Sequence, residues 1–81
     1  MKLRVSNNGE STLTVVLEPW ATEFEVAKGD FIEFRLAGRS SPEACWLIQH
    51  STYGVLVWAE GVEEGEAGIV STYDSEGHLL D

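Results

Sequence analysis

The stretch LTVVLEPWATEFEVAKGD, residues 13–30, decides the fold class of this chain. Apolar and polar side chains alternate along residues 12–18 and again along residues 22–27, on either side of a Glu-Pro-Trp interruption. A period of two is the spacing of a β-strand, in which successive side chains point to opposite faces of a sheet. The segment therefore predicts two strands joined by a corner. The side chains predicted to point inward are Leu13, Val15, Leu17, Phe24 and Val26.

The corner consists of Glu18, Pro19 and Trp20. Because Pro19 has no amide hydrogen and a fixed φ, it cannot lie inside a central strand, and it favours extended geometry at Glu18. The first strand therefore ends here without starting a helix. Trp20 brings roughly 200 Å² of mostly apolar surface to the corner, so we expect it to be buried across the open end of a sandwich. The alternative is an exposed Trp20 beside Trp58, as a binding platform.

A glycine turn at residues 28–30 leads into the next alternating run, FIEFRL at residues 31–36. If the three turn residues are the loop of a hairpin, Val26 faces Ile32 in the neighbouring strand, and the apolar side chains of both strands share one face. In a Greek key, by contrast, the two strands cross between sheets. The side chains predicted to point inward on the second strand are Ile32, Phe34 and Leu36.

The rest of the chain supplies further short apolar runs separated by turn sequences. Residues 44–50, ACWLIQH, are apolar on both faces, which indicates either a central strand or a strand whose second face meets a partner. We therefore expect an all-β chain forming a single domain, residues 1–81. Its architecture is a small antiparallel β-sandwich or a partly closed barrel of about seven strands, with a Greek-key or cupredoxin-like arrangement among the options. The other predicted strands are residues 2–6, 55–60, 69–73 and, as a short eighth, 78–80.

Charge and cysteine content narrow the classes of function. Fourteen acidic side chains against five basic ones give a net charge of −9. Such a surface repels phosphates and anionic lipid headgroups, so we expect neither nucleic-acid nor membrane binding. The single cysteine, Cys45, forms no internal disulfide, and small secreted domains usually need several. Together with the absence of a signal-peptide-like apolar run at the start of the sequence, this predicts a complete, leaderless cytoplasmic protein.

Several of these motifs together resemble a known group of proteins. The run LEPW at residues 17–20, the glycine turn at residues 29–30 and the strand GVLVW at residues 54–58 are similar to segments of short, largely uncharacterised bacterial β proteins that share an EPW corner and a G-x-x-V-W strand. The chain departs from that pattern at Ala21, where the group has Gly, and at Lys28, where it has Pro. The resemblance implies a β fold and no particular activity.

Residues 26–34 also resemble the V-x-x-G-D-x-I-x-F hairpin of cupredoxins and cupins, and this resemblance raises copper ligation as a hypothesis. A blue-copper site needs two His and one Cys, usually with an axial Met. The chain offers Cys45, His50 and His78 as weak candidates, and its one methionine is Met1. The five-residue separation of Cys45 and His50 places them on opposite faces of a strand. We therefore expect no metal and no cofactor, with Cys45 a buried apolar side chain and His50 at a strand end.

Catalytic signatures are missing from the sequence, so we expect no enzyme. Ser40 and Ser41 lie in a loop without a nucleophile-elbow or triad motif around them. An acidic loop lacks the alternating Asp and Asn ligands of a calcium site and reads as a solvated loop. Its glutamates are Glu60, Glu63, Glu64 and Glu66.

Excess apolar side chains on the segment spanning residues 44–60 point to protein–protein contact. The predicted interface residues are Trp46, Ile48, Leu56 and Trp58, and a homodimer through the sheet that carries them is the preferred interpretation. A partner protein of another kind remains open. The first alternative is a small-ligand or metal-binding β domain with its pocket at the Trp20 end. The second is an acidic inhibitor of a basic protein.

Overall fold

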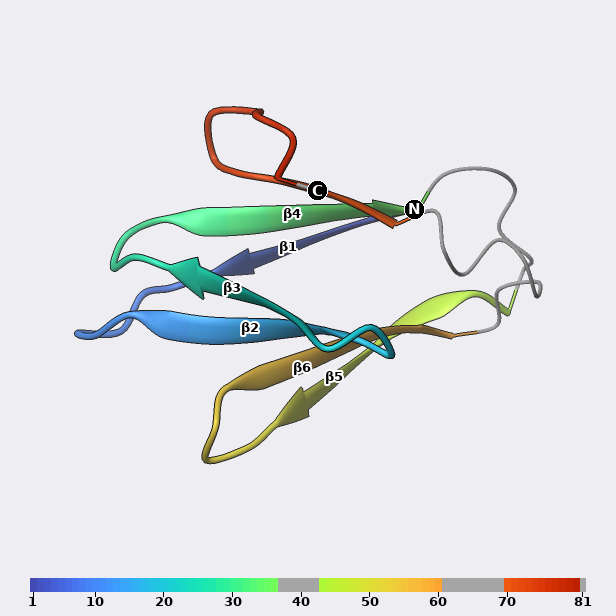
Figure 1. The fold of residues 1–81 in the computed structure, drawn as a ribbon, viewed down its shortest axis with the longest axis horizontal. Coiled ribbons are helices and arrows are strands. Elements are labelled where there is room, and N and C mark those ends of the chain that lie inside the picture. The colour runs from blue at the N-terminus through green and yellow to red at the C-terminus, as the bar shows by residue number, and fades with distance from the viewer. Residues whose placement is uncertain (37–42, 61–69, 81) are drawn as a thin grey trace.

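The computed structural model describes residues 1–36, 43–60 and 70–80. These residues form seven strands and no helix, arranged as two sheets that are not closed into a barrel (Figure 1). Sheet A has the order β1 (Lys2–Ser6), β4 (Phe31–Leu36), β7 (Val70–Tyr73). Sheet B has the order β3 (Thr22–Val26), β2 (Leu13–Glu18), β6 (Val55–Glu60), β5 (Cys45–His50). The expected all-β sandwich of about seven strands is confirmed.

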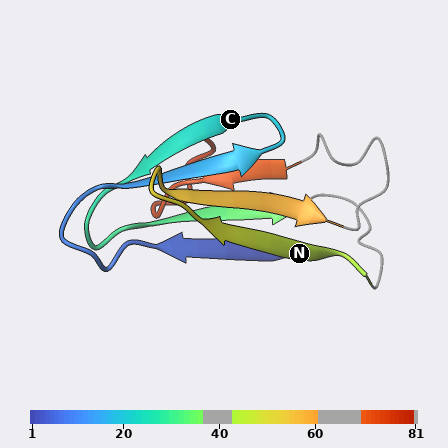
Figure 2. The ribbon, with the colours of Figure 1, turned by 90° about the horizontal axis from the view of Figure 1, so that it is seen from below.

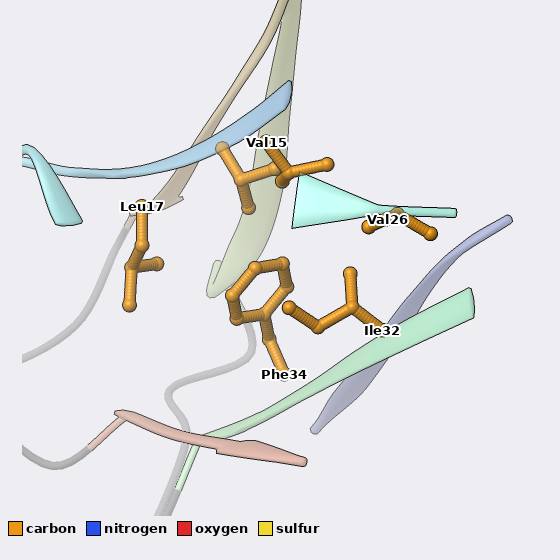
Figure 3. Close-up of a cluster of buried hydrophobic side chains, with 6 residues drawn as sticks. Val15, Leu17, Val26, Ile32 and Phe34 are labelled. Carbon is orange, nitrogen blue, oxygen red and sulfur yellow. The ribbon is translucent and has the colours of Figure 1, made fainter. Parts of the chain in front are cut away.

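The core lies between the two sheets and is made by the alternating side chains (Figure 3). Phe34 of β4 is fully buried and meets Phe24 of β3 edge-on, with ring centroids 5.9 Å apart. Every side chain that was predicted to point inward is either in this core or packed against it or, for Leu36, buried beside it. The buried cluster consists of Val15, Leu17, Val26, Ile32, Phe34 and Val57.

The hairpin predicted for residues 22–36 is wrong. Strand β3 pairs with β2, whereas β4 pairs with β1 and β7, so the chain crosses from sheet B to sheet A at residues 27–30. Val26 and Ile32 therefore face each other across the core rather than along one sheet. Both arrangements bury the same apolar faces, so the periodicity of the two strands did not distinguish them. The second arrangement, crossing between sheets, is the observed one.

A buried asparagine, Asn7, joins this crossing to the one between β1 and β2. Its side-chain amide donates to the carbonyl oxygens of Ser11, at 2.8 Å, and Val26, at 2.9 Å. Its backbone N–H donates to the carbonyl of Asp30, at 2.9 Å, and its own carbonyl accepts from the N–H of Gly29, at 2.8 Å. Buried backbone groups need partners, and Asn7 supplies them for two loops that both change sheets. The sequence showed a turn here but not this role.

Strands β2 and β6 pair in parallel, the one exception among the five pairings of the described strands. The backbones of the two strands come close together where this pairing starts, which explains the glycine of the GVLVW motif, Gly54. A Cβ at Gly54 would lie 2.3 Å from the backbone oxygen of Thr14, and Gly54 has φ of +153°. Only glycine lets the two backbones approach this closely.

The corner after β2 is confirmed, but the predicted burial of Trp20 is wrong. The peptide bond before Pro19 is cis, Ala21 has a positive φ of 56°, and β3 begins at Thr22 and turns straight back along β2. Only residues 19–21 separate β2 from β3, and Trp20 is the middle residue of this turn. Trp20 is left 43% exposed.

The predicted eighth strand, residues 78–80, is reduced to one bridge between Tyr73 and Leu79. The N–H of Leu80 donates to the carbonyl of Thr72, at 2.7 Å, so this segment covers part of the outer edge of β7. None of the segments that the structure describes forms a helix long and apolar enough to cross a bilayer.

Candidate functional site

Strand β5 is an edge strand, which corrects the expectation of a central one. It pairs with β6 on one side, and no other described strand pairs with it (Figure 2). A strand edge presents unpaired N–H and C=O groups that can pair with another chain. The alternative interpretation of residues 44–50, a strand whose second face meets a partner, stays a prediction.

The hydrogen-bond pattern of the β5–β6 hairpin shows which backbone groups lie on this edge. Ser51 and Gly54 exchange two backbone hydrogen bonds, of 2.9 Å and 3.3 Å, and the pairing continues without a bulge along β5. In an antiparallel pair, hydrogen-bonded and non-hydrogen-bonded positions alternate. The backbone groups of Trp46, Ile48 and His50 therefore point away from β6, toward the free edge.

The two faces of β5 differ in how well they are covered. On the inner face, Trp46 packs against Phe34 of the core, with ring centroids 6.3 Å apart. Ile48, on the same face and nearer the end of the strand, is 47% exposed. On the outer face, Leu47 is 37% exposed. Both faces of β5 thus leave apolar surface in contact with solvent.

The outer face of sheet B carries a second, better-covered apolar group. Trp58 is half-buried, lies opposite Leu47 in the register, and donates its indole N–H to the side-chain oxygen of Gln49 at 3.0 Å. Leu56 lies beside Val16 of β2, and Val16 is 4% exposed. These contacts hold the side chain of Trp58 against the outer face of the sheet, so that it is only partly exposed.

The four residues predicted as an interface do not form one patch. Trp46 and Ile48 lie on the inner face of sheet B, whereas Leu56 and Trp58 lie on the outer face. Trp46 is largely a core residue. Of the four, only Ile48 is strongly exposed and also has free backbone groups. Sequence periodicity already separated the two faces, but the position of β5 at an edge was needed to single out Ile48.

Tyr53, in the turn between β5 and β6, was missed by sequence reasoning. It is 60% exposed, and its hydroxyl donates to the carboxylate of Glu23 on β3. This hydrogen bond raises the pKa of the Tyr53 phenol, because losing the proton would place two negative charges together. The contact ties the hairpin to the far edge strand of the same sheet.

Charge distinguishes the edges of the two sheets. The strands of sheet B contain no Lys or Arg, and β5 contains no charged residue at all. On the opposite edge of sheet B, β3 carries Glu23 and Glu25. On sheet A, β1 carries Lys2 and Arg4, and β7 is partly covered by the C-terminal segment. Charged side chains and covered edges are the usual protection against edge pairing, and the described part of β5 has neither.

The outer face of sheet A is built around a carboxylate between two guanidinium groups. Glu33 accepts from Arg4 at 2.9 Å and from Arg35 at 2.6 Å. These two hydrogen bonds hold the pKa of Glu33 below its ordinary value. Arg4 also lies over the ring of Phe31 and Arg35 over the ring of Tyr73, at 4.5 Å and 4.0 Å. The guanidinium groups are thus already occupied by partners within the protein.

The weak metal candidates do not meet. Cys45 and His50 are at opposite ends and on opposite faces of β5, and His78 lies beside Asp74 in the C-terminal turn, 3.3 Å from its carboxylate. Within residues 1–36, 43–60 and 70–80, no three His, Cys, Asp or Glu side chains are close enough to hold a metal ion. Cys45 is exposed, so its predicted burial is wrong.

Some predictions fall outside the residues that the structure describes. This applies to Ser40 and Ser41 and to three glutamates of the acidic loop, Glu63, Glu64 and Glu66. Glu60 is the last residue of β6.

Comparisons of this chain with protein-family models, with curated proteins and with solved structures give no match. The resemblance to short bacterial proteins with an EPW corner therefore stays a prediction, and the candidate site rests on its own geometry.

Proposed function

We propose that this protein is a non-catalytic β domain that acts by protein–protein contact and self-associates through the β5–β6 hairpin. The observation that carries the proposal is the edge of β5, where unpaired backbone groups and the exposed side chain of Ile48 coincide on a strand without charge. Such an edge is stabilised when another strand adds to it, because its N–H and C=O groups gain partners.

Net charge favours this surface over the others for contact between two copies. Each copy carries a net charge of −9. When two copies approach, carboxylates on most surfaces of one copy therefore repel carboxylates on the other. The outer face of sheet B carries Glu18, Glu23, Glu25 and Glu60. Among the described edge strands, β1 carries cations, β3 carries carboxylates and β7 is partly covered, which leaves β5 as the open edge without a charged side chain.

The first test is the oligomeric state of the wild-type protein and of Ile48→Lys, measured over a concentration series by light scattering after size exclusion. The wild type is expected to be a dimer and Ile48→Lys a monomer. The substitution changes the net charge from −9 to −8, so general repulsion between copies falls, and loss of the dimer is then due to the local change at this edge, an apolar side chain replaced by a charged one.

Ser6→Lys is the matched control, because Ser6 is an exposed residue of another edge strand, β1, and the change in charge is the same. It is expected to remain a dimer. Circular dichroism checks that both variants keep their β content. A wild type that is monomeric up to millimolar concentration contradicts the proposal. So does an Ile48→Lys variant that dimerises normally while Trp58→Ala, on the outer face, does not.

A further inference from the structure

We infer that two copies pair β5 with β5 in antiparallel orientation about a two-fold axis, with Ile48 opposite Ile48 of the second copy. The inference rests on the proposed self-association and specifies its geometry. The two four-stranded sheets B would then form one continuous sheet of eight strands, four from each copy.

Symmetry restricts the possible registers of such a pair. In a two-fold dimer the same surface meets itself, and directly opposite residues of antiparallel strands point to the same face of the sheet. The axis must therefore stand perpendicular to the sheet, and one residue of β5 lies opposite its own copy. The inner faces of the two sheets B stay on the same side, so both cores remain closed.

The free backbone groups select Ile48 as the central residue. New hydrogen bonds form between positions whose N–H and C=O groups point to the edge, namely Trp46, Ile48 and His50. Centring on Ile48 pairs Trp46 of one copy with His50 of the other, and all three positions gain partners. Centring on Leu47 instead places His50 opposite Ala44, which precedes the start of β5. The register centred on Ile48 therefore gives hydrogen-bond partners to more of the backbone N–H and C=O groups on the edge of β5.

The side chains are compatible with this register. On the inner face the exposed parts of two Ile48 side chains meet at the axis, with Trp46 opposite His50 on either side. On the outer face Leu47 lies opposite Gln49. No position of β5 brings two like charges together, because the strand has none. Strand addition would therefore bury apolar surface that a single copy leaves in water.

Disulfide cross-linking distinguishes the registers. In a Cys45→Ser background, which removes the one native thiol, Ile48→Cys places two cysteines opposite each other with Cα atoms about 5.5 Å apart, within disulfide range. Two Leu47→Cys residues are offset by two positions and lie about 8 Å apart, beyond that range. We expect Ile48→Cys to form a covalent dimer with a mild oxidant, and Leu47→Cys alone to form little.

A mixture of Leu47→Cys and Gln49→Cys chains is the positive control for Leu47→Cys alone, because these two positions lie opposite each other in the inferred register. It should give the mixed dimer, which intact mass distinguishes from either homodimer. Ser6→Cys, on the exposed β1 edge, measures cross-linking by random collision. Size exclusion before oxidation establishes that each variant is still a dimer.

Each outcome has a separate meaning. A covalent dimer of Leu47→Cys but not Ile48→Cys overturns the register centred on Ile48 and leaves self-association through β5 intact. A non-covalent dimer in which no β5 cysteine cross-links above the Ser6→Cys level overturns the pairing of β5 with itself. A monomeric wild type overturns the proposed function from which this inference starts.

Discussion

The two sheets of the sandwich differ in the sign of the charges on their strands and in how those charges are paired. The strands of sheet A carry three of the basic residues, Lys2, Arg4 and Arg35, against one acidic residue, Glu33. The strands of sheet B carry four glutamates and no Lys or Arg. On sheet A, Arg4 and Arg35 both pair with Glu33 and each lies over an aromatic ring. On sheet B, Glu23 and Glu25 accept hydrogen bonds from the hydroxyls of Tyr53 and Thr14, none of the ion pairs among the described residues involves its glutamates, and part of its apolar surface is exposed.

The edges repeat this contrast. Both edges of sheet A are protected, β1 by its cations and β7 by the C-terminal segment. On sheet B, β3 is protected by Glu23 and Glu25, and β5 has no such protection among the described residues. The proposed contact between two copies is therefore assigned to this one edge of sheet B.

Removing the aromatic contact between the sheets should have the largest effect. Phe34 of sheet A is fully buried and meets Phe24 and Trp46 of sheet B. Phe34→Ala is expected to cost about 3–5 kcal/mol, comparable to the whole stability of an 81-residue domain, roughly 4–12 kcal/mol. Urea denaturation followed by tryptophan fluorescence measures the loss.

The control for this substitution is Phe31→Ala, three residues earlier on the same strand. Phe31 is on the outer face, partly exposed under Arg4, and its removal should cost roughly 1–2 kcal/mol. Equal losses from the two variants would show that the sandwich is not held together mainly by its shared core.

Acidification should remove the contribution that the ion pairs of Glu33 make to the stability of the protein. The folded-state pKa of Glu33 lies below its ordinary value of 4.5 because Arg4 and Arg35 hydrogen-bond to the ionised form. This contribution to stability is therefore complete above the unfolded pKa and is lost as the pH falls through the lower, folded pKa. Wild type should be more stable than Glu33→Gln at pH 7, and the difference should shrink on acidification below about pH 4.5.

Comparing denaturation curves of these two proteins at each pH isolates Glu33, because the other carboxylates, including Asp74 with its own lowered pKa, titrate in both. A stability difference that stays constant down to pH 2 would mean that the charge of Glu33 does not contribute and that its shape and packing do.

The smallest effect is expected at the Tyr53–Glu23 contact of sheet B, where both groups are exposed. Glu23→Gln should lower the phenol pKa of Tyr53 toward its ordinary value of 10.0, because the carboxylate that raises it is gone. Ultraviolet absorbance titration in a Tyr73→Phe background, which leaves one tyrosine, measures this. Glu25→Gln removes a charge of lesser influence on Tyr53 and should move the pKa less. Stability should barely change, and a large loss would mean that this bond supports the sheet.

Much of the local structure followed from the sequence. The alternation of residues 13–18 and 31–36 fixed both the strands and the side chains that point inward, since a period of two leaves only the choice of face. The corner at Pro19 followed from the missing amide hydrogen. The candidate site was found in part. Ile48 was named among four interface residues, but its companions proved to lie on other surfaces or in the core.

Which strand lies beside which could not be predicted from the pattern of apolar residues. The pattern of apolar residues states which face is buried, and it is satisfied equally by a neighbour in the same sheet and by a strand facing it across the core. The choice between these depends on contacts distant in sequence, such as the hydrogen bonds of Asn7 to Ser11 and Val26. Sheet membership in turn made β5 an edge, exposed Ile48, and left Trp20 outside the core. The strands and their inner faces could be predicted from the sequence, because they depend on neighbouring residues along the chain. The position of the free edge is a property of the assembled sandwich.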